Sequence, residues 1–515
     1  MAQQKFPFNP IPWSTTDDQA PEALKSDNVT WAPLIRCPAV FPVQLFETAI
    51  SQLVHHPEYN STLILRSEMV SESIDESQIS PIVPTIQGFT ARWSIRRRLL
   101  PRRPGRDAAL EQHCTLYGHT NTESSEEMSP SILVLTPIVD LGSSLPYYHP
   151  RVSHLAFRYV VSSVPMLQIE VVPLPETPVD LNSRLYRTCL ALLETLHRYG
   201  WGAMIHYKKR VIHDCIVPRE PYQDLYLVMR ERHKHLVNEW HEVTDPLKHV
   251  FEDIGIATFL MLLWNDIYAS HEAETELSPV TSEGEPWRNW SRPPAGFVDM
   301  GCGNGLLTHI LVSEGYGGHG LDLRARTSWA HYPETTQSHL HVEALDPTVL
   351  EDLEASHRYL KPGVFLIGNH ADELTPWIPV LSTLCSASGY LSIPCCSWTF
   401  DMRYERSKCT PYPVPTPYDE FVDGLNLGGD GSNTSAYSMY RIWLASLSHH
   451  CGWKVESETL RIPSTRNWAL VGRVQTWKDD EDAQTSRENV KAIIDNVKGR
   501  GIFKTRTPEG KASEH

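Results

Sequence analysis

Hydrophobic and polar positions follow two patterns along the chain, and the change falls in a proline- and acid-bearing stretch at 278–296. Before it, short apolar runs favour β-strands, whose side chains alternate between two faces. These runs are 61–67, 131–139, 154–161 and 167–174. Apolar positions at helical spacing predict a helix over 184–199 and further helices within 222–268. An α+β module that ends in packed helices is predicted.

Beyond residue 296, predicted strands and helices alternate, which is typical of a parallel sheet with helices on both faces. Strands are expected over 297–300, 319–323, 364–368, 390–394, 454–460 and 468–474. Helices are expected over 305–314, 347–360, 376–386 and 436–450. The predicted fold class is α/β, a Rossmann-like parallel sheet with an antiparallel last strand, preceded by the α+β module.

The same patterns divide the chain into segments. The polar first residues predict a flexible leader, and the charged residues after 475 predict a mobile tail in which one short helix could form. The expected segments are a leader at 1–28, an N-terminal α+β and helical module at 29–277, a linker at 278–296, a Rossmann-like domain at 297–475 with a loop excursion over the active-site face at 397–434, and a tail at 476–515.

The formal net charge is −16, from 46 Lys and Arg against 62 Asp and Glu. Nucleic-acid binding needs Lys and Arg against phosphates, so the overall charge opposes such a partner. Residues 92–106, however, hold seven arginines and no acid, and shorter basic runs lie at 208–210 and 230–234. Any one of these basic runs is explained by a solvent-exposed face of the protein. Three such runs together favour an anionic partner.

The ten cysteines are scattered without C-x-x-C spacing, and only Cys395 and Cys396 are adjacent. This pattern predicts neither a disulfide framework nor a zinc ribbon, so no metal is expected and the two cysteines are interpreted as structural or substrate-lining. The most apolar stretch, 257–264, is too short to cross a bilayer, and the first residues lack signal-peptide features. A reduced, cytoplasmic protein is predicted.

The sharpest chemical signal is FVDMGCGNG, in which an apolar strand ends at Asp299 and leads into Gly301, Gly303 and Gly305. Glycines suit a turn where the backbone approaches a ligand closely. A dinucleotide-binding loop has the spacing G-x-G-x-x-G, whereas residue 306 here is Leu. The loop therefore differs from that of a dinucleotide-binding domain.

S-adenosylmethionine fits this loop better, because its amino-acid end carries a cationic amine that Asp299 can help to hold. Asp322 ends the next predicted strand, where a carboxylate can accept hydrogen bonds from both ribose hydroxyls. A glycine-rich turn with a structural aspartate would also explain the glycine loop or the acid at the strand end, if either stood alone. Together, in this order, they predict a class I S-adenosylmethionine-dependent methyltransferase domain.

Two loops are candidates for the methyl-acceptor side. In GNHADELTPW, after the fourth predicted strand, His370 or Asp372 could orient or deprotonate a hydroxyl, although Asp372 could equally cap a helix. In RIPSTRNW, Arg466 could clamp a phosphate at the same edge of the sheet. These three residues are the candidate catalytic residues.

The chain resembles the fungal and animal tRNA (uracil-2′-O)-methyltransferases that modify serine tRNA near the variable arm. The resemblance rests on the glycine-loop segment 297–329 and on IGNHADELTPWIPVL, IPCC and RIPSTRN, with support from VPREPYQDLYLVMRERH upstream. It implies methyl transfer from S-adenosylmethionine to a uridine ribose 2′-hydroxyl. By the family's motif, Asp299, Gly301, Gly303, Gly305 and Asp322 are implied cofactor residues.

The resemblance makes tRNA the expected partner and the module at 29–277 the candidate tRNA-binding part. No Lys-Asp-Lys-Glu set is evident, which leaves the base open, and no CCCH zinc-finger spacing is present. Two alternatives stay open: a methyltransferase of the same fold that acts on a protein or small molecule, and a non-catalytic scaffold. An accessory protein is neither indicated nor excluded.

Overall fold

The computed structural model describes residues 7–14, 21–120, 129–140, 143–207, 209, 211–269, 284–349, 358–406, 412–415, 417–428 and 433–504. The chain divides into two compact units, Met1–Lys208 and Lys209–His515. Of the helices described, none has the length and apolar character that a bilayer span requires.

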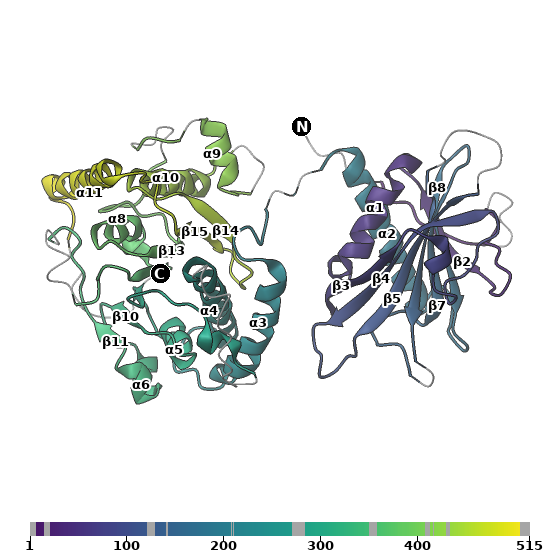
Figure 1. Cartoon of the computed structure of the whole chain (residues 1–515), viewed down its shortest axis with the longest axis horizontal. Helices are drawn as coiled ribbons and strands as arrows, with labels where there is room; N and C mark the ends of the chain where they lie inside the picture. The colour runs from purple at the N-terminus through teal and green to yellow at the C-terminus, as the bar shows by residue number, and fades with distance from the viewer. Residues whose placement is uncertain are drawn as a thin grey trace. The chain divides into compact units, whose positions relative to one another are not determined.

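The first unit is built on an eight-stranded antiparallel sheet in the order β1-β2-β8-β7-β6-β5-β4-β3 (Figure 1). The strands are β1 (Ile11–Pro12), β2 (Ala32–Pro38), β3 (Ile64–Ser73), β4 (Phe89–Pro101), β5 (Leu110–His119), β6 (Ile132–Ile138), β7 (Val152–Val160) and β8 (Met166–Pro173). Strands β3, β6, β7 and β8 overlap the four runs predicted as strands, which are thereby confirmed.

Two helices complete the core of this unit. Helix α1 (Phe46–His55) packs against α2 (Arg184–Met204), and α2 also packs on β2 and β8. Helix α2 is capped by Ser183, whose hydroxyl accepts a hydrogen bond from the backbone N–H of Tyr186 at 3.1 Å. The helix predicted over 184–199 is confirmed and extends to residue 204.

The prediction of a flexible leader at 1–28 is wrong for the residues that the structure describes there. Strand β1 pairs with β2, and the backbone N–H of Leu24 donates to the Glu170 carboxylate at 2.7 Å. Glu170 is completely buried and pairs with Arg158 at 3.1 Å. A buried carboxylate needs such partners. The hydrogen bond from Leu24 therefore holds this part of the chain against the sheet, and local composition does not reveal it.

The arginine run at 92–106 lies on β4 and the turn after it, and its side chains occupy two environments. Arg97 is only 4% exposed and donates to the carbonyl oxygens of Leu53 and Val54 and to the side chain of Gln112. The exposed arginines are Arg98, Arg102, Arg103 and Arg106. Because side chains alternate between the faces of a strand, the run is not a uniform basic patch.

The second unit is built on a seven-stranded sheet in the order β11-β10-β9-β12-β13-β15-β14 (Figure 1). The strands are β9 (Phe297–Met300), β10 (Gly318–Asp322), β11 (Leu340–Val342), β12 (Phe365–Asn369), β13 (Gly389–Ile393), β14 (Glu456–Thr459) and β15 (Trp468–Gly472). Strand β15 runs antiparallel to β13 and β14, whereas β9 to β13 pair in parallel. The predicted parallel sheet with an antiparallel last strand is confirmed.

The helices of this unit are α3 (Arg219–His233), α4 (Pro246–Tyr268), α5 (Leu306–Ser313), α6 (Glu334–Gln337), α8 (Trp377–Leu384), α9 (Tyr418–Gly424), α10 (Ala436–His450) and α11 (Asp480–Arg500). Those predicted at 305–314, 376–386 and 436–450 are confirmed as α5, α8 and α10. Most of the helix predicted over 347–360 lies outside the described residues.

The domain boundary predicted at 278–296 differs from the division that the structure shows after Lys208. Helix α4 packs on α3 and α5, and its Trp264 is completely buried against Phe297 of β9, with 5.8 Å between ring centroids. A helix that is apolar on all sides must be covered on all sides, and the sheet of the second unit covers it. Lys208 and Arg210 of the second basic run lie outside the described residues.

The tail predicted to be mobile forms a long helix, α11, capped by Asp479, whose side chain accepts from the backbone N–H of Asp482 at 2.9 Å. Its apolar residues Val490, Ile493, Ile494 and Val497 enter the core of the second unit. Beyond it, Phe503 packs edge-on against Trp377, with centroids 5.6 Å apart. Over the described residues 476–504 the prediction is wrong, because four apolar residues at helical spacing stabilise an otherwise charged helix.

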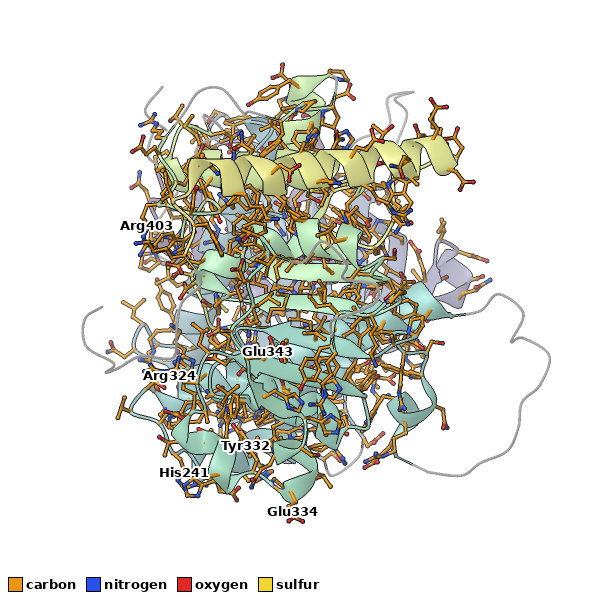
Figure 2. All side chains as sticks on the ribbon, turned by 90° about the vertical axis from the view of Figure 1, so that its left-hand side faces the viewer. His241, Arg324, Tyr332, Glu334, Glu343 and Arg403 are labelled. Carbon is orange, nitrogen blue, oxygen red and sulfur yellow. The ribbon has the colours of Figure 1, made fainter. Side chains whose placement is uncertain are left out.

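The excursion at 397–434 does not line the cavity described below, as far as its residues are described. Its Phe400 packs on Trp377 and Trp443, with centroid distances of 4.7 and 6.0 Å. Figure 2 shows Arg403, from this stretch, well apart from Glu343, which lines the cavity. That this stretch covers the active-site face stays a prediction.

Candidate functional site

The glycine loop turns from the end of β9 into α5 through three left-handed residues. Gly301, Gly303 and Gly305 have φ values of +73°, +55° and +75°, which other residues adopt only with strain. A Cβ at Gly303 would meet no atom within 4 Å. The loop therefore presents open backbone at its middle glycine, as a ligand-binding loop requires.

Gly305 has a different role from the other two glycines. It is the N-cap of α5, and a Cβ there would lie 2.9 Å from a methyl group of Leu340 and 3.2 Å from Trp329 Nε1. The Trp329 indole N–H also donates to the carbonyl oxygen of Gly303 at 3.0 Å. Gly305 is thus needed for close packing behind the loop and does not line the cavity.

Asp322, at the end of β10, is hydrogen-bonded to the backbone of the glycine loop. Its Oδ2 accepts the backbone N–H of Gly303 at 2.9 Å, and its Oδ1 accepts that of Arg324 at 3.3 Å. The side chain remains half-buried. A carboxylate oxygen accepts more than one hydrogen bond, so these bonds leave capacity for a ligand.

Asp299 lies beneath the loop and is 1% exposed. Its Oδ2 accepts the Thr308 hydroxyl at 3.2 Å, whereas its buried Oδ1 has no hydrogen-bond partner among the described residues. Burial raises the pKa of Asp299 to about 7, against the lowering effect of Thr308. An ionised Asp299 would therefore gain from a cationic partner, because an unpaired buried charge is costly.

A cavity of about 460 Å³ opens at this edge of the sheet. Of the predicted site residues it is lined by Asp299, Gly301, Gly303, Asp322, His370 and Asp372, and not by Gly305 or Arg466. Eight carboxylate side chains line it, those of Glu242, Glu252, Asp253, Asp299, Asp322, Glu343, Asp372 and Glu373. Such a wall suits a cationic ligand.

Sequence reasoning missed five of these acids: Glu242, Glu252, Asp253, Glu343 and Glu373. Glu252 and Asp253 were missed because α4 was interpreted as a core helix. Asn369 Nδ2 donates to Asp253 Oδ1 at 3.2 Å. Burial raises the pKa of Asp253 well above its usual value, and the charges of Glu252 and Asp299 raise it further. Adjacent acids inside an otherwise apolar helix were the signal that could have identified them.

His370 contacts Glu252 of α4, and both residues line the cavity. Its Nε2 lies 3.0 Å from Glu252 Oε1, and its buried Nδ1 has no hydrogen-bond partner in the part of the chain described. Burial raises the pKa of Glu252, but hydrogen bonds with His370 and Ser464 hold it below the ordinary value. Glu252 therefore stays ionised at neutral pH and links His370 to the loop that carries Arg466.

Asp372 lies two residues further along and is exposed. The Cys395 thiol donates to its Oδ1 at 3.2 Å. His370 and Asp372 both have positive φ, +53° and +45°, in a backbone conformation that is uncommon for residues with a Cβ. Strain of this kind occurs at functional loops, and it places both side chains at the cavity.

Arg466 lies on the loop between β14 and β15, outside the cavity. Its guanidinium stacks on the Tyr437 ring, 3.9 Å from the centroid, and the Tyr437 hydroxyl donates to Pro394 O at 2.8 Å. Pro394 directly precedes Cys395. Arg466 is therefore exposed at the edge of the sheet where β13 ends, beside the cavity.

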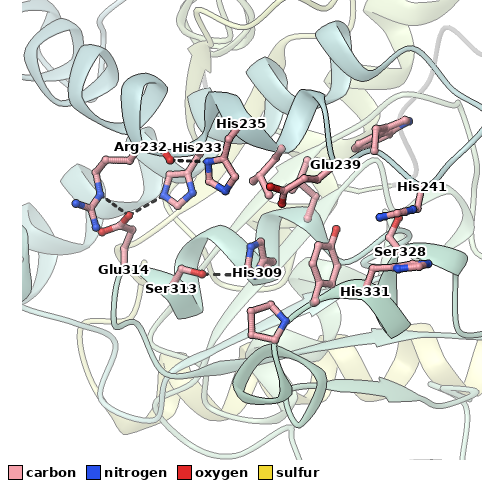
Figure 3. A pocket seen from close by; sticks show the side chains of 15 residues that line it. Arg232, His233, His235, Glu239, His241, His309, Ser313, Glu314, Ser328 and His331 are labelled. Carbon is pink, nitrogen blue, oxygen red and sulfur yellow. Dashed lines mark hydrogen bonds and ion pairs between the residues drawn. The ribbon is translucent and has the colours of Figure 1, made fainter.

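A second cavity, of about 820 Å³, lies where α3 meets α5 (Figure 3). Buried Glu314 accepts hydrogen bonds there from Arg232 at 2.8 Å, His233 at 2.6 Å and Trp287 at 2.9 Å. Burial raises the pKa of Glu314, but these bonds lower it to about 2. No predicted site residue lines this cavity, and its ion-pair network serves the packing of α3 on α5.

Two family models match the chain. Residues 9–210 match the model described as TRM44-like, N-terminal bet v1-like domain, and residues 216–282 and 286–347 match a predicted AdoMet-dependent methyltransferase. The tRNA (uracil-O(2)-)-methyltransferase of Schizosaccharomyces pombe is 34% identical over 95% of this chain and 94% of its own length. Its counterparts in Neurospora crassa and Saccharomyces cerevisiae are 34% and 30% identical, over 86% and 83% of this chain and 86% and 84% of their own lengths.

Proposed function

Because the chain belongs to the tRNA (uracil-O(2)-)-methyltransferase family, we propose that it transfers a methyl group from S-adenosylmethionine to the ribose 2′-hydroxyl of a uridine in tRNA. The observation that carries this proposal is one cavity that joins Asp299, the glycine loop and Asp322 to His370 and Asp372. It opens beside β9, where the strand order of the sheet reverses. Ligands bind at this switch point in open α/β sheets.

The residues at this edge fit S-adenosylmethionine. The unpartnered Oδ1 of Asp299 and the carboxylate-lined wall suit the cationic amine and sulfonium, and the open backbone at Gly303 admits a ligand. Asp322 would accept hydrogen bonds from the ribose hydroxyls. When bound, this cofactor supplies an electrophilic methyl group.

The chain's own residues would prepare the acceptor hydroxyl. With Nε2–H donating to Glu252, the His370 ring has its lone pair on Nδ1, which can take the hydroxyl proton. Since Nδ1 is buried, the ring must turn toward the cavity first, and catalytic hydrogen bonds often form only with substrate bound. The ionised Glu252 would stabilise the resulting imidazolium, and the exposed Asp372 would orient the ribose.

Arg466 is proposed as a phosphate clamp beside the target nucleotide. Stacking on Tyr437 fixes the plane of its guanidinium, and a planar guanidinium binds phosphate in a bidentate manner. Loss of this clamp would weaken productive tRNA binding and also misplace the hydroxyl.

The finer proposals concern fold, substrate and location. The strand order and antiparallel β15 support a class I methyltransferase fold. Serine tRNA, near its variable arm, is the proposed substrate, with the first unit as a tRNA-binding module. The described cysteines are free thiols, which fits a cytoplasmic location.

The test is mass mapping of ribose methylation in total tRNA from cells with and without this chain. Loss of one 2′-O-methyluridine from serine tRNA is expected, and purified protein with S-adenosylmethionine should restore it. A tRNA with 2′-deoxyuridine at that position is the matched control and should accept no methyl group. If every ribose-methylated uridine persists without the chain, and the protein methylates no tRNA, the proposal is wrong.

A further inference from the structure

Three ligand-bearing side chains converge at the ends of two adjacent parallel strands. Asp372 follows β12, and Cys395 and Cys396 follow β13, which pairs with β12 up to Asn369 opposite Ile393. One oxygen of Asp372 and the two sulfur atoms all lie within 4.8 Å of one another. Cys395 and Cys396 lie 23 and 24 positions after Asp372 in the sequence, so no spacing motif marks the cluster.

We propose that Asp372, Cys395 and Cys396 form a binding site for Zn²⁺ or a similar thiophilic divalent cation. Thiolate and carboxylate oxygen are donors that Zn²⁺ accepts. A tetrahedral zinc ion with standard bond lengths separates such donors by about 3.6–3.8 Å. Cys395 Sγ already lies 3.2 Å from Asp372 Oδ1, so small side-chain shifts complete this geometry.

The site is built for three protein ligands and one open position. Asp372 is exposed, and both cysteines are half-buried. Three protein ligands with an exchangeable fourth position are the pattern of catalytic zinc, whereas structural zinc is enclosed by four. Of the three, Asp372 also lines the cavity and the two cysteines do not, so the site borders the cavity at Asp372.

The role of the cation rests on the proposed function. A hydroxyl bound to a divalent cation loses its proton more readily, and a ribose 2′-hydroxyl is a poor nucleophile at neutral pH. A cation on this cluster would therefore polarise the acceptor hydroxyl and leave its proton to water or to the His370 ring. Asp372 then acts as a ligand and not as a base.

The site is tested by metal binding to the full chain, without any methylation assay. Protein stripped with a chelator is titrated with Co²⁺, whose bonds to thiolates give a charge-transfer absorption, and then with Zn²⁺, which displaces it. We expect one equivalent per chain. Cys395→Ser, Cys396→Ser and Asp372→Asn should each weaken binding by about tenfold or more, since even residues that only support metal ligands cost that much.

The matched control is Cys215→Ser, which removes an exposed thiol outside the cluster and should bind one equivalent unchanged. Thermal unfolding of each variant shows whether it is folded. No stoichiometric binding in the wild type, or equal binding in the wild type and in a folded double variant C395S/C396S, would overturn the site. One equivalent bound by a chain that methylates no tRNA would leave the site standing and overturn the proposed function.

Discussion

The Asp322 carboxylate accepts the backbone N–H of Gly303 at 2.9 Å, which ties the end of β10 to the middle of the glycine loop. One acid therefore has two tasks. It fixes the loop conformation, and it is the proposed acceptor for the cofactor's ribose hydroxyls. Removal of the carboxylate is expected to end both.

The first prediction is that Asp322→Ala weakens S-adenosylmethionine binding. Charge-assisted hydrogen bonds contribute about 1.5–3 kcal/mol, which corresponds to a dissociation constant raised by about 10- to 150-fold. Calorimetry measures the change. Asp495→Ala, which removes an exposed acid of α11, is the control, and equal affinity in the two variants would remove Asp322 from the site.

The second prediction concerns pH and Asp299. With its pKa raised to about 7, the carboxyl is neutral below this pH and can hold the cofactor's amine only above it. Affinity should rise by about tenfold from pH 6 to pH 8, and Asp299→Asn should abolish that rise. Since the folded pKa exceeds the unfolded one, Asp299 also contributes less stability as pH rises from about 4 to 7. A flat affinity profile in the wild type would contradict the assignment.

The third prediction separates catalysis from binding. His370→Ala should lower single-turnover methylation at saturating tRNA by about 10²–10⁴-fold, the usual contribution of a general base, with cofactor affinity near normal. Glu252→Gln should lower it less, because the ring loses its charged partner but keeps a hydrogen-bond acceptor. Asp372→Asn should also slow the step. His331→Ala, an exposed histidine of the other cavity, is the control. If His370→Ala and Asp372→Asn both methylate at the wild-type rate, neither residue acts as a base, and the enzyme accelerates the reaction only by positioning its substrates.

The fourth prediction is that the exposed and the buried arginines of the run at 92–106 have different roles. Replacement of the exposed Arg98, Arg103 and Arg106 by Ala should weaken tRNA binding and lower the salt slope by about one for each phosphate that is no longer neutralised. Arg187→Ala, an exposed arginine of α2, should bind tRNA as the wild type does. An unchanged slope in the triple variant would show that the run is only a solvated face.

Arg97→Ala should instead lower the free energy of unfolding, because it leaves buried acceptors on Leu53 and Gln112 without their donor and removes one of two donors to the Val54 carbonyl. Each such acceptor costs about 1–3 kcal/mol. Urea denaturation measures the loss. Stability equal to that of Arg98→Ala would contradict the buried network.

The fifth prediction is acid sensitivity from Glu314. Its folded pKa of about 2 lies below the unfolded value of 4.5, so its stabilising effect is complete above about pH 4.5 and is lost as pH falls toward 2. The difference corresponds to about 3 kcal/mol. Denaturation of wild type and Glu314→Gln from pH 6 to pH 3 should give curves that converge at low pH. Parallel curves would show that Glu314 is not the group responsible.

Much of the second unit followed from local sequence alone. Strands β9 and β10, helix α5 and the loop between them were predicted because apolar periodicity and three glycines in a fixed order restrict the backbone without help from distant residues. Asp299 and Asp322 became candidate site residues for the same reason: Asp322 ends β10 and Asp299 is the last residue but one of β9, and the position of each strand is set by its own pattern.

Only the tertiary structure decided which side chains meet. Arg97 and Arg98 look alike in the sequence, but the pleat of β4 buries one and exposes the other. The sequence around Glu252 predicts only a core helix, whereas the packing of α4 brings Glu252 into contact with His370. Nothing in the sequence relates Asp372 to Cys395, and the two residues meet because β12 pairs with β13. Local patterns record what each segment prefers, whereas interactions between distant segments arise when their buried faces pack together.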